Sequence, residues 1–329
     1  MIITRSPLRV SFLGGGSDFP SHFRTHGGAV LATAIDKFAY VTVSPLSGKF
    51  HGCRYKLTYS KVEVASSLDE IRHPAIRAGI RLACPDAELE MHYVADLPAG
   101  TGLGSSSSFV VALLQALYGF RNRLVAMEQL ARDAIQIERV ELAEPGGVQD
   151  QVLAAYGGFN LITFSGENDF DVQRIPLSQG RLQEIESHCL LLYTGMNRSS
   201  GEVLLEQSRR NNDGSNAKLL CSLADLAHRG AEHIASDRPI LDFGHLLHEG
   251  WLIKKRLAPL SLPQIDRTYE AALQLGATGG KLLGAGRGGF LLVWAPPEKH
   301  AAIAGAAEQM TPLRIRVATS GATIIHASA

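Results

Sequence analysis

The chain has 329 residues, 45% of them hydrophobic, which is enough for two domains or one large one with a sizeable core. Lysine plus arginine and aspartate plus glutamate are equal at 32 each, and no block of like charge occurs. This balance provides no basic field for nucleic acid or for an acidic membrane surface, so neither is expected as a partner.

The cysteines and the N-terminus predict a cytoplasmic protein. Cys53, Cys84, Cys189 and Cys221 are widely spaced and form no Cys-x-x-Cys pair, which argues against a zinc site or a thioredoxin motif. Free thiols are typical of a reducing cytosol. The first residues lack a signal-peptide pattern, and the longest apolar stretch, 109–117, is too short to span a bilayer.

The first half of the chain predicts mainly strands, with a helix after a glycine-rich loop. A strand is expected over residues 2–13, broken at Pro7. Residues 55–64 alternate apolar and polar and are expected to form one half-buried strand. Residues 166–177 are punctuated by glycine and proline and are expected to be a domain border. The remaining predicted elements are strands at 29–44, 88–94 and 160–164 and helices at 74–84, 109–117, 125–142 and 148–155.

The second half predicts helices between short strands. Its end reads strand–helix–strand, which is typical of a ferredoxin-like layer. The whole chain is therefore predicted to be an α+β protein of two domains, residues 1–180 and 181–329. The predicted elements are strands at 189–194, 290–295 and 313–318, helices at 200–211, 217–235, 243–256, 264–275 and 298–309, and a glycine-rich loop at 279–289.

The most informative segment is Pro98–Ser108, Pro-Ala-Gly-Thr-Gly-Leu-Gly followed by four serines, here called the first glycine loop. Glycines at every second position let backbone N–H groups turn inward, and a helix N-terminus behind them adds positive partial charge. Such a cradle suits an anion, usually a nucleotide phosphate. The loop matches neither Gly-Lys-Ser/Thr nor Gly-x-Gly-x-x-Gly. A plain turn with a helix cap is the alternative.

This segment resembles the second motif of the GHMP kinases, Pro-x-Gly-x-Gly-Leu-Gly-Ser-Ser, and the resemblance runs from Arg5 to about Pro296. It implies a ribosomal S5 domain 2-like N-terminal domain and a ferredoxin-like C-terminal domain. It also implies ATP as the phosphoryl donor. The residues expected to hold ATP are Pro98, Gly100, Gly102, Leu103, Gly104, Ser105, Ser106 and Ser107.

Residues 7–18 resemble the first motif of the family, Pro-Gly-Arg/Lys-x-x-x-x-Gly-Glu-His-x-Asp. The match implies that Arg9 is a catalytic cation near the reaction centre and that Asp18 holds sugar hydroxyls. Two glycines replace the Glu-His pair, which resembles the heptose- and fucose-kinase branch rather than galactokinase. On the residues alone, a turn cap is the first explanation of Asp18, and Arg9 is as well explained as a solvated or salt-bridged strand residue. The substrate contacts implied here are Gly15, Gly16, Ser17 and Asp18.

Phosphoryl transfer requires positioning, a metal ion and charge stabilisation. Mg²⁺ prefers oxygen ligands and keeps several waters, so one carboxylate and one hydroxyl can suffice. The resemblance implies Glu138 and Ser106 as the metal ligands and Asp150 as the catalytic carboxylate, with Gly147 beside the substrate. Taken alone, Glu138 would be an exposed helix charge and Asp150 a helix cap.

Residues 280–290 resemble the third motif, Lys-x-x-Gly-Ala-Gly-Gly-Gly-Gly, and imply close backbone approach between the domains. Gly286 and Arg287 are predicted substrate contacts, and Arg287 either clamps a phosphate or points into solvent. Arg198, followed by two serines at a predicted helix start, is a predicted second anion site. Residues 248–255 also resemble the heptose-kinase branch, but most of this run is interpreted as an amphipathic core helix.

The resemblance as a whole implies an ATP- and Mg²⁺-dependent kinase acting on a small sugar phosphate. The member it favours phosphorylates the C1 hydroxyl of D-glycero-D-manno-heptose 7-phosphate, an early step toward nucleotide-activated heptose for surface polysaccharide. Self-association into a homo-oligomer is compatible with the sequence. Two alternatives stay open: a kinase for another sugar such as L-fucose, and a catalytically silent sensor of sugar and ATP. A serine hydrolase is disfavoured because Gly-x-Ser-x-Gly is absent.

Overall fold

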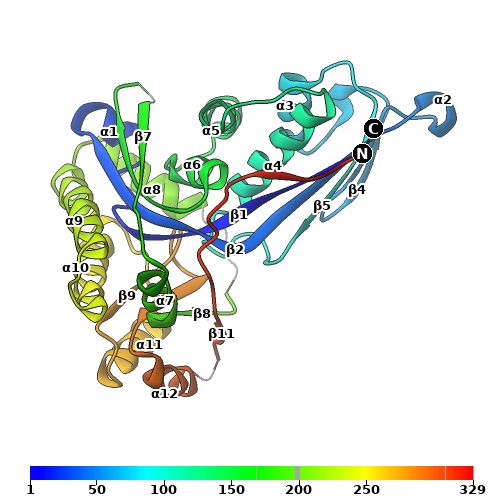
Figure 1. The fold of residues 1–329 in the computed structure, drawn as a ribbon. Helices are drawn as coiled ribbons and strands as arrows, with labels where there is room; N and C mark the ends of the chain where they lie inside the picture. Colours follow the sequence, from blue (N-terminus) through cyan, green and yellow to red (C-terminus); the bar gives the residue numbers. More distant parts are fainter. Residues whose placement is uncertain (168, 197–200, 308, 329) are drawn as a thin grey trace.

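The computed structural model describes residues 1–167, 169–196, 201–307 and 309–328, with side chains of the third range described from Leu204 onward. Two β-sheets organise it (Figure 1). The first has eight strands, with β1 and β2 at its centre and β12, from the chain's end, beside β1. Its strands are β1 (Ile2–Leu13), β2 (Gly28–Pro45), β3 (Tyr55–Thr58), β4 (Val62–Ala65), β5 (Leu89–Ala95), β6 (Phe159–Ser165), β7 (Asp169–Arg174) and β12 (Thr323–Ala327).

Strand β1 continues through Pro7, so the predicted break there is wrong. Pro7 is paired with Phe38 of β2, and the register shifts between Pro7 and Arg9. Strand β12 pairs only with residues 2–5 of β1, so on that side there is no ladder for a missing N–H to interrupt. The strand therefore continues past this irregularity and includes Arg9.

Other predicted elements of the first half need correction in detail. Residues 55–64 form not one strand but the hairpin β3–β4, which turns where the Tyr59 N–H donates to the Lys61 carbonyl oxygen. The predicted border 166–177 contains β7, which pairs with β6. A helix before β8, α7 (Gln179–His188), was not predicted.

A helical layer covers one face of the first sheet. Helix α4 (Ser105–Phe120) is at its centre and packs on β1 and β2 with α3 (Pro74–Ala83) and α6 (Gln149–Tyr156) against it. After its four initial serines α4 is apolar except at Gln115, so it is buried on nearly every side, as expected of a core helix. The smaller helices of this half are α1 (Pro20–His26), α2 (Gly48–His51) and α5 (Met127–Ile135), with the 3₁₀ turn η1 (Leu68–Glu70) and the π-helix η2 (Gln136–Glu141).

The second sheet confirms the ferredoxin-like prediction. Its antiparallel order is β11-β8-β10-β9, and helices lie between β8 and β9 and between β10 and β11. The strands of this sheet and the helices between them are β8 (Cys189–Tyr193), α8 (Gly201–Asn212), α9 (Ala217–Ala235), η3 (Ile240–Asp242), α10 (Phe243–Leu257), α11 (Pro263–Gln274), β9 (Gly279–Leu282), β10 (Phe290–Trp294), η4 (Pro297–Lys299), α12 (His300–Ala306) and β11 (Thr311–Leu313).

The two halves share a hydrophobic core. Helices α9 and α10 pack on the first sheet, and Phe12 of β1 makes ring contacts with Phe159, Phe243 and Trp294. At the end of the chain β12 returns to β1, and the two termini lie side by side (Figure 1). The division at residue 180 stays a prediction. In the described part of the chain, no helix is both long and apolar enough to cross a membrane.

Candidate active site

The first glycine loop has the conformation that its sequence predicts. Gly100, Gly102 and Gly104 all have positive φ, +76°, +82° and +74°, which favours glycine over any other residue. Gly104 is the N-cap of α4, so the serines form the first helical turn. The backbone N–H groups of Ser105, Ser106 and Ser107 precede the first intrahelical bond, which Ser108 donates to the Gly104 carbonyl oxygen, and they are available to an anion.

The second glycine loop, residues 279–289, packs directly on the first. A Cβ atom at Gly102 would lie 2.6 Å from the Leu283 carbonyl oxygen, and one at Gly284 would lie 2.4 Å from the Gly102 Cα atom. Backbone therefore meets backbone at this junction, which only glycines permit. The predicted close approach of the two loops is confirmed.

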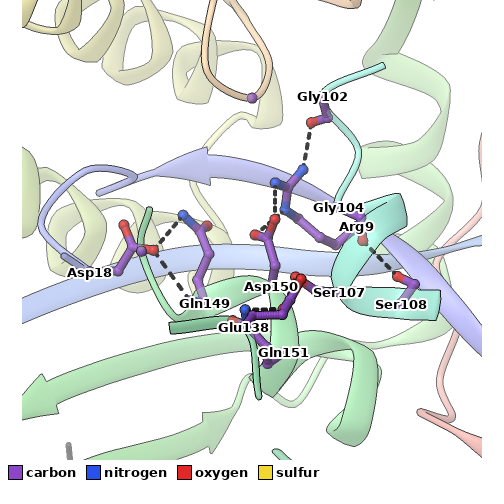
Figure 2. A network of polar contacts seen from close by, with 12 residues as sticks. Arg9, Asp18, Gly102, Gly104, Ser107, Ser108, Glu138, Gln149, Asp150 and Gln151 are labelled. Carbon is purple, nitrogen blue, oxygen red and sulfur yellow. Dashed lines mark hydrogen bonds and ion pairs between the residues drawn. The ribbon is translucent and has the colours of Figure 1, made fainter. Parts of the chain in front are cut away.

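Arg9 and Asp150 form a bidentate ion pair beside the first glycine loop (Figure 2). Arg9 Nε donates to Asp150 Oδ1 at 2.7 Å, and Nη2 donates to Oδ2 at 2.6 Å. The third guanidinium nitrogen, Nη1, donates to the Gly102 carbonyl oxygen at 2.6 Å. The salt-bridge alternative for Arg9 is thus correct, and its partner is the predicted catalytic carboxylate. One side chain fixes both the loop and Asp150.

Glu138 is a buried carboxylate, so the alternative of an exposed helix charge is wrong. Only 1% of the residue is exposed, and it lies on η2, where the backbone changes from α- to π-helical winding. Such changes often occur at functional sites. Its Oε2 accepts hydrogen bonds from Ser107 Oγ, at 2.7 Å, and from the Gln151 amide (Figure 2).

The surroundings of Glu138 fit a divalent cation. Burial raises the pKa of its carboxyl, partly offset by Arg139 and by the hydrogen bonds from Ser107 and Gln151. No ion pair to Glu138 occurs in the described part of the chain, although a buried charge is costly unless it is compensated. Ser106, the other predicted ligand, is exposed and lines the same cavity. Carboxylate and hydroxyl oxygens are the donors that Mg²⁺ prefers.

Asp18 lies at the other end of the network, where it is 1% exposed. Its Oδ1 accepts from the Gly16 N–H at 2.8 Å, as the turn-cap alternative predicts, and its Oδ2 accepts from the Gln149 side-chain amide at 3.0 Å (Figure 2). A Cβ atom at Gly147 would lie 1.8 Å from Asp18 Oδ2. The glycine is therefore what leaves room for this carboxylate.

Most of the predicted site residues line one cavity, and the structure brings them together from β1, α4, η2, α6 and the second glycine loop. Pro98, Ser17, Leu103 and Arg287 are not among the lining residues, and Arg198 lies outside the described residues. The predicted residues that line the cavity are Arg9, Gly15, Gly16, Asp18, Gly100, Gly102, Gly104, Ser105, Ser106, Ser107, Glu138, Gly147, Asp150 and Gly286.

Three residues predicted to contact ATP or the substrate have other partners in the structure. The Ser17 hydroxyl donates to the carbonyl oxygens of Gly14 and Ala29 and so closes the turn after β1. Leu103 is fully buried in the hydrophobic core. Arg287 has a φ of +59°, and its guanidinium donates to the Pro259 carbonyl oxygen at 3.3 Å.

Two buried lysines in the cavity were missed by sequence reasoning. Lys254, on α10, donates to the Gly284 carbonyl oxygen at 3.2 Å, and Lys281, on β9, donates to the Phe12 carbonyl oxygen at 3.0 Å. Both are at least 90% buried. For Lys254 the available signal is its place three positions after Trp251 on a helix interpreted as core, and for Lys281 it is the lysine position of the third motif.

Comparison with known proteins finds two family models that match this chain. The family model described as GHMP kinases N terminal domain matches residues 67–158, and GHMP kinases C terminal matches residues 234–310. The chain is 27% identical over 315 residues to D-glycero-alpha-D-manno-heptose 7-phosphate kinase of Campylobacter jejuni, with 91% of this chain and 90% of that protein covered.

Two further relatives extend the comparison. A bifunctional fucokinase/GDP-fucose pyrophosphorylase of Arabidopsis thaliana is 26% identical over 317 residues. The match covers 90% of this chain but only 30% of that longer protein. The crystal structure of a D-glycero-D-manno-heptose 1-phosphate kinase from Bacteroides thetaiotaomicron has the same fold, with a TM-score of 0.82, 22% identity and full coverage of both chains.

Proposed function

The chain belongs to the GHMP kinase family and is a sugar kinase, and on this premise we propose that it phosphorylates the C1 hydroxyl of D-glycero-D-manno-heptose 7-phosphate at the expense of ATP. The observation that carries the proposal is one cavity lined by an anion-binding glycine loop, the Arg9–Asp150 pair and a buried Glu138. The product would be a 1,7-bisphosphate, an intermediate suited to nucleotide-activated heptose for surface polysaccharide.

In this proposal the first glycine loop and the N-terminus of α4 hold the phosphates of ATP. Glu138 and Ser106 would hold Mg²⁺, which when bound neutralises charge on the phosphates. The ion pair with Arg9 keeps Asp150 in place. Asp150 lies next to Gly104, where a Cβ atom would be 3.3 Å from Asp150 Oδ2. Asp150 then orients the sugar hydroxyl and accepts its proton as the new oxygen–phosphorus bond forms.

The acceptor is proposed to lie on the Asp18 side of the cavity. There Gly15 and Gly16 line the cavity at the positions where the family motif has a Glu-His pair, and this departure disfavours galactose. Two of the similar proteins are named for heptose phosphates, one for the 7-phosphate and one for the 1-phosphate. L-Fucose is the second candidate, because the chain is also similar to a fucokinase.

A screen of ADP release across free sugars and sugar phosphates tests the substrate. Heptose 7-phosphate is expected to exceed free heptose, galactose and fucose in kcat/KM by about 10²-fold or more, since a site built for a charged group rejects analogues without it. Faster turnover of an unphosphorylated sugar would reject the proposed substrate and leave the sugar kinase in place. An absence of turnover with every acceptor, despite ATP binding, would support the sensor alternative.

Glu138→Gln tests the proposed metal site. The amide keeps the shape and can still accept from Ser107, but it removes the charge. The Mg²⁺ concentration for half-maximal activity is expected to rise about 10–100-fold, with kcat largely recovered at high Mg²⁺. Glu141→Gln, an exposed position on the same π-helix, is the matched control and should leave the Mg²⁺ dependence unchanged. A defect in Glu138→Gln that is independent of Mg²⁺ would argue against ligation.

A further inference from the structure

Lys254 is the least expected charged residue of the cavity. It comes from α10, in the second half of the chain, yet its ammonium also lies near Arg9, Asp18 and Asp150 of the first half. It donates a hydrogen bond to the Gly284 carbonyl oxygen, and no carboxylate forms an ion pair with it in the described ranges. An ammonium has three donors, so Lys254 retains hydrogen-bonding capacity inside a buried site.

Other unused polar atoms gather near it around Gly15. A Cβ atom at Gly15 would lie 3.2 Å from Ser11 Oγ, 3.5 Å from Gln149 Nε2 and 4.0 Å from Lys254 Nζ. Among the described residues, buried Ser11 Oγ and Gln149 Oε1 have no hydrogen-bond partner, nor has Gln207 Nε2 next to Gly16. Buried polar groups are normally paired, so these atoms indicate a polar ligand in the cavity.

Among the residues that the structure describes, no carboxylate serves as a dedicated counterion for Lys254. The Arg9 charge is already paired with Asp150, and Asp18 accepts hydrogen bonds from uncharged donors. Burial lowers the pKa of Lys254 to about 8, Asp18 and Asp150 act in the opposite direction, and Arg9 lowers it further. Lys281, also buried, has a lowered pKa from burial first and from the nearby Lys254 second. A bound anion would relieve both lysines.

The position of Lys254 points to one anion in particular. Its Nζ contacts Gly284, which packs on Gly102 of the first glycine loop, while its other side faces Gly15 and the Asp18 carboxylate. The ammonium thus lies between the proposed nucleotide and acceptor sides of the cavity. A phosphoryl group in transfer crosses this boundary with negative charge spread over its equatorial oxygens.

We propose that Lys254 is a catalytic residue that contacts the phosphoryl group while it passes from the nucleotide to the acceptor. This inference rests on the proposed kinase function. The acceptor oxygen forms a bond to the γ-phosphorus, the bond from that phosphorus to the β,γ-bridging oxygen breaks, and ADP leaves with the electron pair. The acceptor proton goes to Asp150. Lys254 stays protonated and supplies charge only.

Lys254→Met is the main test, because methionine keeps most of the length of the side chain and removes its charge. We expect kcat to fall about 10²–10³-fold, the loss typical of one preorganised donor in a transition state, with KM for ATP changed by no more than about threefold. Lys254→Arg should recover part of kcat. Lys255→Met, the exposed neighbour on the same helix, is the control and should behave as wild type. Unchanged kcat in Lys254→Met would overturn the proposal.

The pH dependence gives a second readout. The charged groups that face Lys254 are Asp18, Asp150, Arg9 and Lys281. In wild type, kcat/KM should fall as pH rises through about 8, where the free enzyme loses the Lys254 proton. This alkaline limb should be absent in Lys254→Met and displaced to higher pH in Lys254→Arg. A limb retained in Lys254→Met would assign the titration to another group and count against the proposal.

Stability separates a functional lysine from a structural one. Because the folded state lowers the pKa of Lys254, the unfolded chain binds this proton more tightly, and folding is penalised below about pH 8. The penalty is relieved as pH rises from about 8 toward the usual lysine range. Ligand-free Lys254→Met should therefore melt at pH 7 no lower than wild type, and the proposal predicts this even though activity is lost. A lower Tm would assign Lys254 a structural role instead.

Binding of a transition-state mimic keeps the test independent of the acceptor's identity. Aluminium fluoride should tighten MgADP in wild type and Lys255→Met, in the presence of whichever acceptor wild type phosphorylates fastest. In Lys254→Met this tightening should be reduced at least about 30-fold, with the affinity for MgADP alone retained. Equal tightening in both variants would refute the role of Lys254. A different preferred acceptor would refute only the proposed substrate.

Discussion

Asp150→Asn is expected to lower kcat about 10²–10⁴-fold while the protein stays folded and binds MgATP. The substitution keeps the shape of the side chain and removes the charge that orients the sugar hydroxyl and accepts its proton. The ion pair with Arg9, at 2.6 and 2.7 Å, is lost at the same time. Single-turnover kinetics with saturating substrates measure the effect directly.

Loss of stability has to be separated from loss of catalysis. Removing Asp150 leaves the Arg9 guanidinium, whose side chain is 7% exposed, without its counterion, at a cost on the order of 3 kcal/mol. Thermal unfolding of the variant, with and without ATP, monitors this. Asp133→Asn is the matched control, since Asp133 is another partly buried carboxylate that accepts two hydrogen bonds, from Tyr118 and Gln129. A folded Asp150→Asn protein with near-normal kcat would show that the carboxylate is not catalytic.

Gly102→Ala is expected to abolish measurable ATP binding or weaken it by at least about 10²-fold. A Cβ atom there would lie 2.6 Å from the Leu283 carbonyl oxygen, and both contacting segments are backbone, so the two glycine loops must separate. The positive φ of +82° adds strain of about 1–2 kcal/mol. Calorimetric titration with MgADP and with MgATP measures the loss.

Gly52→Ala isolates the strain from the clash. Gly52 has a similar φ of +67°, but a Cβ atom there would meet nothing within 4 Å. Both variants should lose stability through backbone strain, and only Gly102→Ala should lose nucleotide affinity. If Gly102→Ala binds ATP as wild type does, the first glycine loop is not the nucleotide site.

The sequence predicted the elements with strong periodicity or many β-branched residues, and it did less well where pairing decides the structure. The helix predicted at 217–235 has the bounds found for α9, and β2 differs from its prediction by one residue at each end. The hairpin β3–β4 and strand β7 were missed because a tight turn inside an alternating run leaves little trace in composition. Strand register, as at Pro7, depends on neighbours far along the chain.

The same division holds in the cavity. Asp18 and Asp150 could be predicted because each stands within a contiguous motif of the sequence, although their side-chain partners, Gln149 and Arg9, lie far away along the chain. Ser107 rather than Ser106 bonds Glu138, a difference of one position on a helix that no motif resolves. Lys254 reaches the cavity only because α10 packs on the first sheet, a tertiary contact that a local pattern does not contain.

The pairing of β12 with β1 joins the two ends of the chain, where the amino group of Met1 donates to the Ser328 hydroxyl at 3.0 Å. During synthesis, β1 leaves the ribosome before the other strands described here, and β12 emerges after them. Until then residues 2–5 of β1 form an open sheet edge, with unpaired backbone groups that can recruit a strand from another molecule. Aggregation during translation, and its prevention by chaperones, should therefore concentrate at this edge, and early termination of the chain would leave it permanently uncovered.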